Sequence, residues 1–127
     1  MQLFKKVIII WVLTMFTTVA CTHKKPTYFY HVLLIEFTQD APINQMTDEI
    51  LHFKQIPSVI DVAFGKIKEH QRNTITNFTH CLILTFKDKQ GLEAYLKAPY
   101  HVKIYEKHKS HIAAIQTADF NAISLTE

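Results

Sequence analysis

Tyr95 and His101 are the residues of this sequence whose types and spacing best suit proton-transfer chemistry. Pro99 lies between them, so the two residues cannot share one continuous helix face. A turn at Pro99 would let His101 point back toward the Tyr95 hydroxyl, and a phenol beside an imidazole can act as an acid/base pair near neutral pH. The spacing therefore predicts Tyr95 and His101 as catalytic residues. In the alternative interpretation, Tyr95 packs in the core and His101 caps the start of a helix.

Two more histidines, His31 and His80, fall on predicted strand faces that are otherwise apolar, and Leu33 and Ile35 share the face of His31. Imidazoles on such a face must find hydrogen-bond partners or stay neutral. They could hydrogen-bond to each other, to Tyr95 or to the backbone and so fix the core. They could instead bind a metal, but a metal site needs three or four convergent ligands, and neither a metal nor a cofactor is predicted. The functional prediction is a ligand pocket lined by His31, Leu33, Ile35 and His80.

The remaining titratable residues carry weaker signals. His108 and His111 are predicted to be exposed and solvated. Glu36 and Asp119 are single carboxylates on separate strands, and they are predicted to form ion pairs or to lie at a sheet edge. Cys81 is predicted to act as a small hydrophobic residue.

The composition indicates one ordinary domain. The chain has 127 residues, of which 48% are hydrophobic and 20% charged, which excludes a disordered tail and a multi-pass membrane protein. The net charge of +3 includes Lys5 and Lys6 near the N-terminus, and basic and acidic residues nearly balance in the rest of the chain. No nucleic-acid partner is therefore predicted.

The first twenty residues have the organisation of a secretory signal peptide. Lys5 and Lys6 form a basic region, residues 7–16 are apolar, and small residues follow up to Ala20. The apolar stretch is too short for a spanning helix, which needs about 20 residues. Residues 18–21, Thr-Val-Ala-Cys, resemble the lipobox of bacterial lipoproteins, with Cys21 as the lipidated first residue of the mature chain. An uncleaved N-terminal anchor helix is the alternative.

Hydrophobic periodicity predicts strands alternating with helices in the rest of the chain. Gly65 is predicted as a bulge or turn point in the second strand, and residues 68–77 are predicted to form a loop. The order is β-α-β-β-α-β, the split βαβ pattern of ferredoxin-like α+β folds. The predicted strands are residues 31–37, 59–66, 78–86 and 112–120, and the predicted helices are residues 42–56, 89–97 and 100–108.

The predicted sheet is apolar on both faces. Helices on one side would leave the other face, with Val32, Leu34, Cys81 and Ile83, without cover. Too few residues remain in the chain to cover it. A second copy of the chain is therefore predicted as a partner, in a homodimer.

Several landmarks in order resemble the Dabb family of stress-responsive dimeric α/β-barrel domains. The resemblance covers about residues 31–121. The landmarks are His31 at the first strand, Ile56-Pro57 before the second, Gly65 near its end, Phe78-Thr79-His80 at the third, Ala94-Tyr95 followed by Pro99-Tyr100-His101, and Asp119-Phe120 in the last.

The resemblance implies a protomer whose sheet packs face to face against the sheet of a second protomer, giving a dimeric α+β barrel. It also implies a pocket between sheet and helices, lined in the family by the first-strand and third-strand histidines. In the plant polyketide cyclases of this family, a Tyr and a His in a Tyr-x5-His segment act in acid/base cyclisation. Tyr95 and His101 match these positions, but a shorter first crossover means that the cyclase substrate does not carry over.

The sequence as a whole predicts a bacterial lipoprotein at the extracytoplasmic face of the cell envelope. Its Dabb-like domain is expected to bind a small apolar or aromatic molecule, with cyclase- or lyase-like chemistry. The alternative function is a non-enzymatic stress-response or envelope-associated dimer. The predicted segments are a signal peptide at residues 1–20, a polar tether at 21–30, the domain at 31–121 and a tail at 122–127.

Overall fold

The computed structural model describes residues 27–68 and 77–123. The predicted signal peptide and Cys21, most of the tether, most of the predicted loop and the end of the C-terminal tail lie outside these residues. None of the helices within the described ranges is long and apolar enough to cross a membrane. The elements in chain order are β1 (Phe29–Phe37), α2 (Ile43–Leu51), η1 (His52–Gln55), β2 (Val59–Lys66), β3 (His80–Phe86), α3 (Lys89–Lys97), α4 (Pro99–His108), η2 (Lys109–His111) and β4 (Ile112–Asn121).

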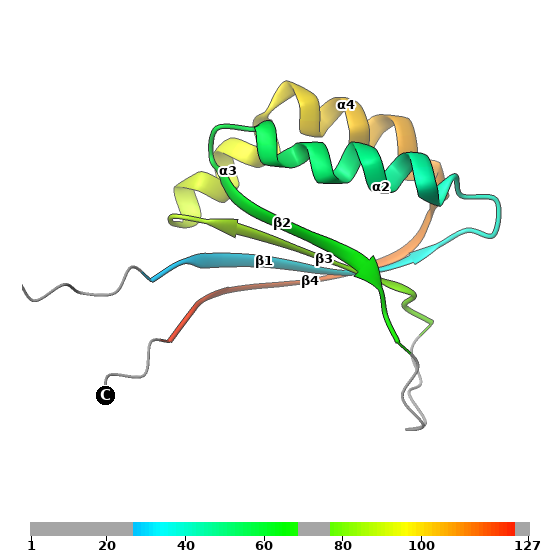
Figure 1. Cartoon of the computed structure of the whole chain (residues 1–127), viewed down its shortest axis with the longest axis horizontal. Helices are drawn as coiled ribbons and strands as arrows, with labels where there is room; N and C mark the ends of the chain where they lie inside the picture. Colours follow the sequence, from blue (N-terminus) through cyan, green and yellow to red (C-terminus); the bar gives the residue numbers. More distant parts are fainter. Residues whose placement is uncertain (1–26, 69–76, 124–127) are drawn as a thin grey trace, which may run out of the picture.

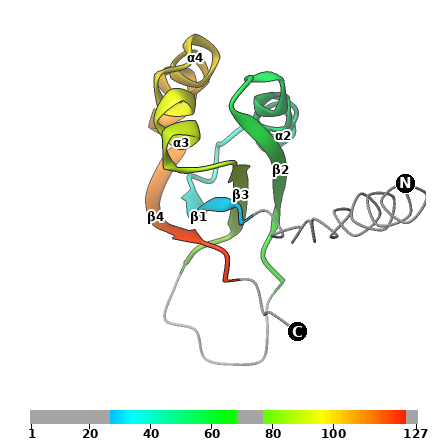
Figure 2. The ribbon, with the colours of Figure 1, turned by 90° about the vertical axis from the view of Figure 1, so that its left-hand side faces the viewer.

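The four strands form one antiparallel sheet in the order β2-β3-β1-β4. The helices α2, α3 and α4 all lie on one side of it, as Figure 1 and the end view in Figure 2 show. The predicted order of elements and the ferredoxin-like α+β protomer are confirmed. The third strand begins two residues later than predicted, at His80.

Alternation along the strands decides which residues face the helices. In β3, Leu82, Leu84 and Phe86 are buried under the helices, while the residues between them face the other way. The bulge predicted at Gly65 is wrong. Gly65 has no positive φ, and the register of β2 against β3 shifts instead between Val59 and Asp61.

Helix α2 is amphipathic and buries Met46 and Ile50 against the sheet. The chain then tightens into the 3₁₀ turn η1, which buries Phe53, and it becomes extended at Ile56. Pro57 explains this end, because the residue before a proline is disfavoured in the helical region. The prediction of a helix that stops before Pro57 is thus confirmed in type, with its last turn 3₁₀ rather than α.

Proline also separates α3 from α4. The Asp88 side chain caps α3 by accepting a hydrogen bond from the Gly91 amide at 3.0 Å. Ala98 is extended, with φ −62° and ψ 131°, because Pro99 follows it. Pro99 then occupies the first turn of α4, where its missing N–H group costs no hydrogen bond. Two short helices that meet at an angle therefore replace one continuous helix.

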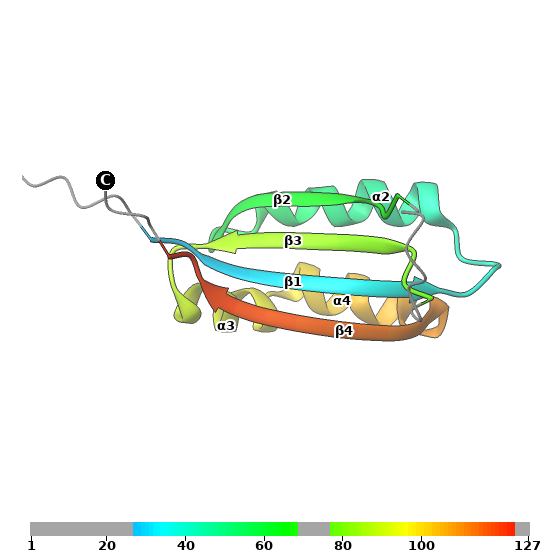
Figure 3. The same ribbon diagram turned by 90° about the horizontal axis from the view of Figure 1, so that it is seen from below.

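Figure 3 looks onto the sheet face opposite the helices, and no described helix covers it. Val32, Leu34, Cys81 and Ile83 lie on this face and are half-buried within the protomer. Val32 pairs with Ile83 and Leu34 with Cys81 across β1 and β3, so the four side chains form one apolar patch. We call these four residues the open-face patch.

Candidate functional site

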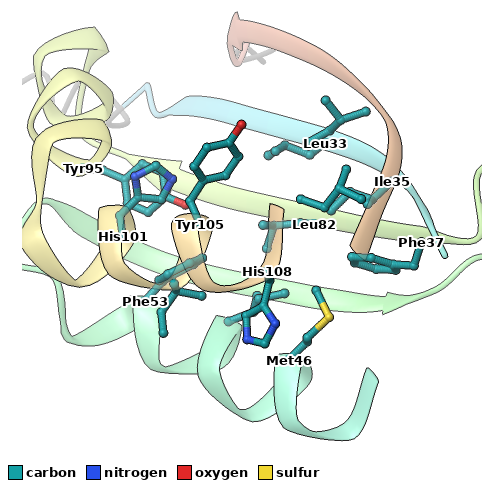
Figure 4. A pocket seen from close by; sticks show the side chains of 14 residues that line it. Leu33, Ile35, Phe37, Met46, Phe53, Leu82, Tyr95, His101, Tyr105 and His108 are labelled. Carbon is teal, nitrogen blue, oxygen red and sulfur yellow. The ribbon is translucent and has the colours of Figure 1, made fainter. Parts of the chain in front are cut away.

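A cavity of about 70 Å³ lies between the sheet and the helices α2 and α4 (Figure 4). Its lining is mostly aliphatic and aromatic. Tyr105 and Ile115, which line its side between α4 and β4, are about half exposed and form its opening to solvent. The lining residues are Leu33, Ile35, Phe37, Met46, Ile50, Phe53, Leu82, Tyr95, His101, Ile104, Tyr105, His108, Ile112 and Ile115.

Tyr95 and His101 meet at one end of this cavity. Their ring centroids are 4.3 Å apart, with an angle of 44° between the ring planes. Tyr95 is 2% exposed and is packed on its other sides by Phe53 and Phe86. Burial raises the pKa of the Tyr95 phenol well above its usual range, so the hydroxyl stays protonated at physiological pH. The turn at Pro99 thus brings the predicted pair together, although Tyr95 is also a core residue.

The His101 ring is oriented by the end of the preceding helix. Its Nδ1–H group donates to the Leu96 carbonyl at 3.2 Å, one of the last carbonyls of α3 that lack an intrahelical partner. The donated hydrogen fixes the tautomer and leaves Nε2 with the free lone pair. Burial, opposed in part by the Leu96 bond, lowers the pKa of His101. His101 therefore caps the end of α3 rather than the start of a helix.

His31 lies behind Tyr95 and does not line the cavity. Its Nδ1 is 2.5 Å from the Asp119 carboxylate, which reaches it from the neighbouring edge strand β4. The ring centroids of His31 and Tyr95 are 6.5 Å apart. The contacts therefore run in series from Asp119 at the sheet edge, through His31 and Tyr95, to His101 at the cavity. For Asp119 the sequence predicted an ion pair or a position at a sheet edge, and it did not identify His31 as the partner.

His80 lies apart from His31, Tyr95 and His101, and neither of the histidines predicted to bind the ligand is among the residues that line the cavity. In the register, His80 pairs with Ile35, whereas His31 pairs with Leu84, which separates the two histidines by roughly 13 Å along the strands. His80 stacks on Phe64 and packs edge-on against Phe37, outside the cavity lining. The predicted ligand residues Leu33 and Ile35 do line the cavity, together with Tyr95 and His101.

The prediction that His108 is exposed is also wrong. His108 is 4% exposed, lines the cavity, and its Nε2 lies 2.5 Å from the Glu49 carboxylate of α2. Lys107 binds the other carboxylate oxygen, and Gln45 donates to it at 3.3 Å. These hydrogen bonds lower the pKa of Glu49 to about 2, and the bond from Lys107 has the largest effect, followed by that from His108. Only the position of His108 at helical spacing from His101 and Ile104 could have indicated that it faces inward.

His111 lies beside His108, with 6.3 Å between the ring centroids, and is partly buried. Its Nδ1 is 3.8 Å from the Asp40 carboxylate.

Among residues 27–68 and 77–123, no cluster of three or more His, Cys, Asp or Glu side chains is arranged to hold a metal ion. Cys81 sits on the open face of the sheet, and burial raises the pKa of its thiol. The thiol is therefore a poor nucleophile at neutral pH.

Comparisons with known proteins agree with this architecture. The family model described as the Stress responsive A/B Barrel Domain, Dabb, matches residues 29–122. The chain is 27% identical over 93 residues to the stress-response A/B barrel domain-containing protein At5g22580 of Arabidopsis thaliana, covering 72% of this chain and 84% of the relative. It is 28% identical over 96 residues to DABB1 of the same plant, where the match covers 72% of this chain and 46% of the relative.

Solved structures of similar fold share little sequence with the chain. At3g17210 from Arabidopsis thaliana superposes with a TM-score of 0.70 and 21% identity, covering 78% of this chain and 99% of that one. A hydroxynitrile lyase from Passiflora edulis superposes with a TM-score of 0.68 and 15% identity, covering 80% of this chain and 98% of the lyase. A dimeric ferredoxin-like protein from Thermobifida fusca superposes with a TM-score of 0.62 and 17% identity, covering 77% of this chain and 93% of that protein. At these identities the likeness is one of fold.

Proposed function

The chain belongs to the stress-responsive A/B barrel (Dabb) domain family, and from this premise we propose that its cavity binds a small, largely apolar molecule and that Tyr95 and His101 perform acid/base chemistry on it. The observation that carries the proposal is the contact of the two rings, 4.3 Å between centroids, at the end of an otherwise apolar cavity. Few convergent polar groups in an apolar pocket are typical of ligand sites.

The two side chains have complementary roles in this proposal. His101 has a lowered pKa and is therefore neutral at physiological pH, with its Nε2 lone pair free to accept a proton from the bound molecule. Tyr95 has a raised pKa and is a neutral phenol, which can donate a hydrogen bond to an oxygen where negative charge develops. His31, held by Asp119, packs near the Tyr95 ring and positions it.

The size of the cavity limits the ligand. Pockets for drug-sized ligands have volumes of about 300–1,000 Å³, and this cavity has about 70 Å³. We therefore expect a molecule of a few non-hydrogen atoms, or one that enters by displacing Tyr105 at the opening. The similarity of fold to a hydroxynitrile lyase supports lyase-like chemistry as the first reaction to test.

A second candidate function is a non-enzymatic stress-response or envelope-associated dimer. The small cavity and the packing of Tyr95 by Phe53 and Phe86 favour it, because both are features of a filled core. Under this alternative, the histidines only complete hydrogen bonds inside the domain.

Homodimerisation through the open-face patch is part of both functions. The patch is apolar, and none of the described helices covers it. Similar structures from Thermobifida fusca and Jannaschia are described as dimeric ferredoxin-like proteins, which supports a face-to-face pair of sheets closing into a barrel.

We further propose that the chain is a bacterial lipoprotein anchored at the extracytoplasmic face of the cell envelope through Cys21. The support is the order of basic, apolar and small residues before Ala20-Cys21. Several acyl chains on one cysteine would hold the domain stably at a membrane, where a single chain is marginal.

A ligand screen separates the two functions. The full-length chain is tested for a rise in melting temperature with small alcohols, carbonyl compounds and nitriles, and for cleavage of a cyanohydrin and cyclisation of a β-polyketide. The first function predicts a ligand or substrate whose effect disappears in His101→Ala. The absence of any response in the wild-type chain, with a loss of stability in the variant, would leave the non-enzymatic dimer.

A further inference from the structure

His108 is a second polar group in the cavity, and neither the predicted catalytic pair nor the family resemblance uses it. It lies seven residues after His101 on α4, which is two helical turns, so both rings project from the same helix face. Seven residues correspond to about 10 Å of helix. Figure 4 shows the two rings at separate positions along α4, with apolar residues such as Leu82 and Met46 around them.

Glu49 determines how the His108 ring can be used. The Glu49 carboxylate can only accept, so the Nε2 of His108 carries the hydrogen in their 2.5 Å bond. Lys107 and Gln45 hold the same carboxylate, and the Tyr100 hydroxyl donates to the Glu49 backbone carbonyl at 3.1 Å. The carboxylate is thus held in place from several sides, and the ring it orients has little freedom to turn.

The other nitrogen of the ring, Nδ1, is without a partner in the part of the chain that the structure describes. Nδ1 of His108 is a buried polar atom without a hydrogen bond among the described residues, in a side chain that is 5% exposed. Buried polar groups are nearly always hydrogen-bonded, so a buried nitrogen without a partner, on a side chain that lines a cavity, calls for an explanation. With the hydrogen on Nε2, a neutral imidazole presents a lone pair at Nδ1.

We propose that Nδ1 of His108 accepts a hydrogen bond from a hydroxyl group of the bound molecule, so that the cavity selects small alcohols over molecules that carry no donor. His108 is a specificity-determining residue in this proposal, and Glu49 is its positioning residue. The inference rests on the proposed ligand-binding function and adds the class of ligand to it.

The geometry also suggests how such a ligand would lie. A cavity of about 70 Å³ that is lined from His101 to His108 is narrow, because its lining spans about 10 Å of α4. A slim molecule would place its hydroxyl at His108 and its second polar group near Tyr95 and His101. A branched molecule or a large ring would have to open the side of the cavity at Tyr105.

Three probes of similar shape test the proposal. Butan-2-ol can donate a hydrogen bond, butan-2-one can only accept one, and 2-chlorobutane has no donor and is a very weak acceptor. Each is titrated into the full-length chain, with the histidine side-chain nitrogens observed by NMR. The wild-type chain is expected to bind butan-2-ol about threefold to tenfold more tightly than the other two, as one buried hydrogen bond typically allows. Only the alcohol should shift the Nδ1 resonance of His108.

The matched variants are His108→Phe, which keeps a ring of similar size without a nitrogen, and His111→Phe, which changes the neighbouring histidine outside the cavity lining. The first is expected to bind all three probes with equal affinity, and the second to keep the preference for the alcohol. If His108→Phe does not fold, the Nδ1 shifts of the wild-type chain decide the question by themselves.

The outcomes distinguish the proposed role of His108 from the proposed binding of a ligand in the cavity. Binding of all three probes without preference, or preference for the ketone, would overturn the role of His108 while leaving ligand binding in place. A preference that survives in His108→Phe would have the same meaning. If none of the probes shifts the resonance of any cavity residue, the ligand-binding function fails and the role of His108 fails with it.

Discussion

The rings of Tyr95 and His101 contact each other at 4.3 Å between centroids, although they belong to two helices, α3 and α4, that meet at Ala98 and Pro99. The extended conformation of Ala98 turns the chain, and the bond from His101 to the Leu96 carbonyl holds the turned ring against Tyr95. A continuous helix would place positions six residues apart on different faces. The break at Pro99 is therefore what creates the candidate acid/base pair.

Removing the Tyr95 hydroxyl distinguishes a catalytic role of Tyr95 from a role in packing alone. If the pair is catalytic, Tyr95→Phe should lower the rate of the detected reaction by about 10²–10⁴-fold while the melting temperature changes little, because the ring remains in place. The rate and the thermal unfolding curve are measured on the same preparation. Tyr30→Phe is the control, since Tyr30 lies on the open face and stacks on Phe120. Equal rates in both variants would count against Tyr95 as an acid/base group.

The lowered pKa of His101 predicts how the site depends on pH. Burial favours the neutral ring, so His101 should take up a proton only below its ordinary pKa of 6.5. A reaction that needs the neutral imidazole as a base therefore keeps its rate to a lower pH than an exposed histidine would allow. NMR titration of the His101 ring checks this without a known substrate. The same resonance in the urea-unfolded chain should titrate near the ordinary value, and identical midpoints would contradict the prediction.

The bond between His31 and Asp119 joins a buried ring to an edge-strand carboxylate. Asp119→Ala leaves the imidazole of His31, which is 7% exposed, without this partner and should cost about 1–3 kcal/mol of unfolding free energy. Asp61→Ala is the matched control, because Asp61 pairs with Lys54 at 2.8 Å on the exposed surface. Such exposed pairs contribute about 0–1 kcal/mol. Urea unfolding of both variants gives the comparison, and equal losses would show that burial of His31 adds nothing.

Glu49 should make the domain sensitive to acid. Its pKa is lowered from 4.5 to about 2 in the folded chain, so its stabilising contribution is complete above pH 4.5 and is lost as the pH falls toward 2. Glu49→Gln removes the titrating carboxyl group. The difference in unfolding free energy between wild type and variant should therefore shrink as the pH falls from 4.5 toward 2. Glu93→Gln, on the exposed face of α3, is the control. A constant difference from pH 5 to pH 2 would contradict the role of Glu49.

The open-face patch should hold two protomers together. Ile83→Lys places a charge at the centre of the proposed sheet-to-sheet interface, where burying it unpaired would cost several kcal/mol. Light scattering should show a dimer for the wild-type chain and a monomer for this variant. Leu51→Lys places the same charge on an exposed position of α2 and should remain dimeric. A well-folded wild-type monomer would exclude the barrel.

Lipidation of Cys21 is tested in bacteria with a clickable palmitate. The wild-type chain should incorporate the label and fractionate with membranes, and Cys21→Ser should lose both properties. Cys81→Ser controls for the loss of a cysteine elsewhere in the chain. Label that persists in Cys21→Ser, or a wild-type chain found only in the soluble periplasm, would contradict the lipoprotein proposal.

Local patterns in the sequence were sufficient for most of the fold. Period-two alternation identified the buried face of β3, with Leu82, Leu84 and Phe86, because neighbouring strand residues must point to opposite sides. Pro57 and Pro99 marked two helix boundaries, because proline restricts the residue before it whatever surrounds it. The bulge at Val59 was not predicted, because it depends on how β2 pairs with β3.

The site depended on contacts that no local pattern contains. Alternation placed His31 and His80 on the correct face, but the pairing of His80 with Ile35 and of His31 with Leu84 sets them far apart along it. His108 was predicted to be exposed and solvated. It is buried instead, because Glu49 of α2 supplies a carboxylate that compensates its nitrogen. The sequence by itself determined the elements, the faces and the Tyr95–His101 pair across Pro99. Only the tertiary structure decided which polar side chains share the cavity, since strand register and helix packing join residues far apart in the chain.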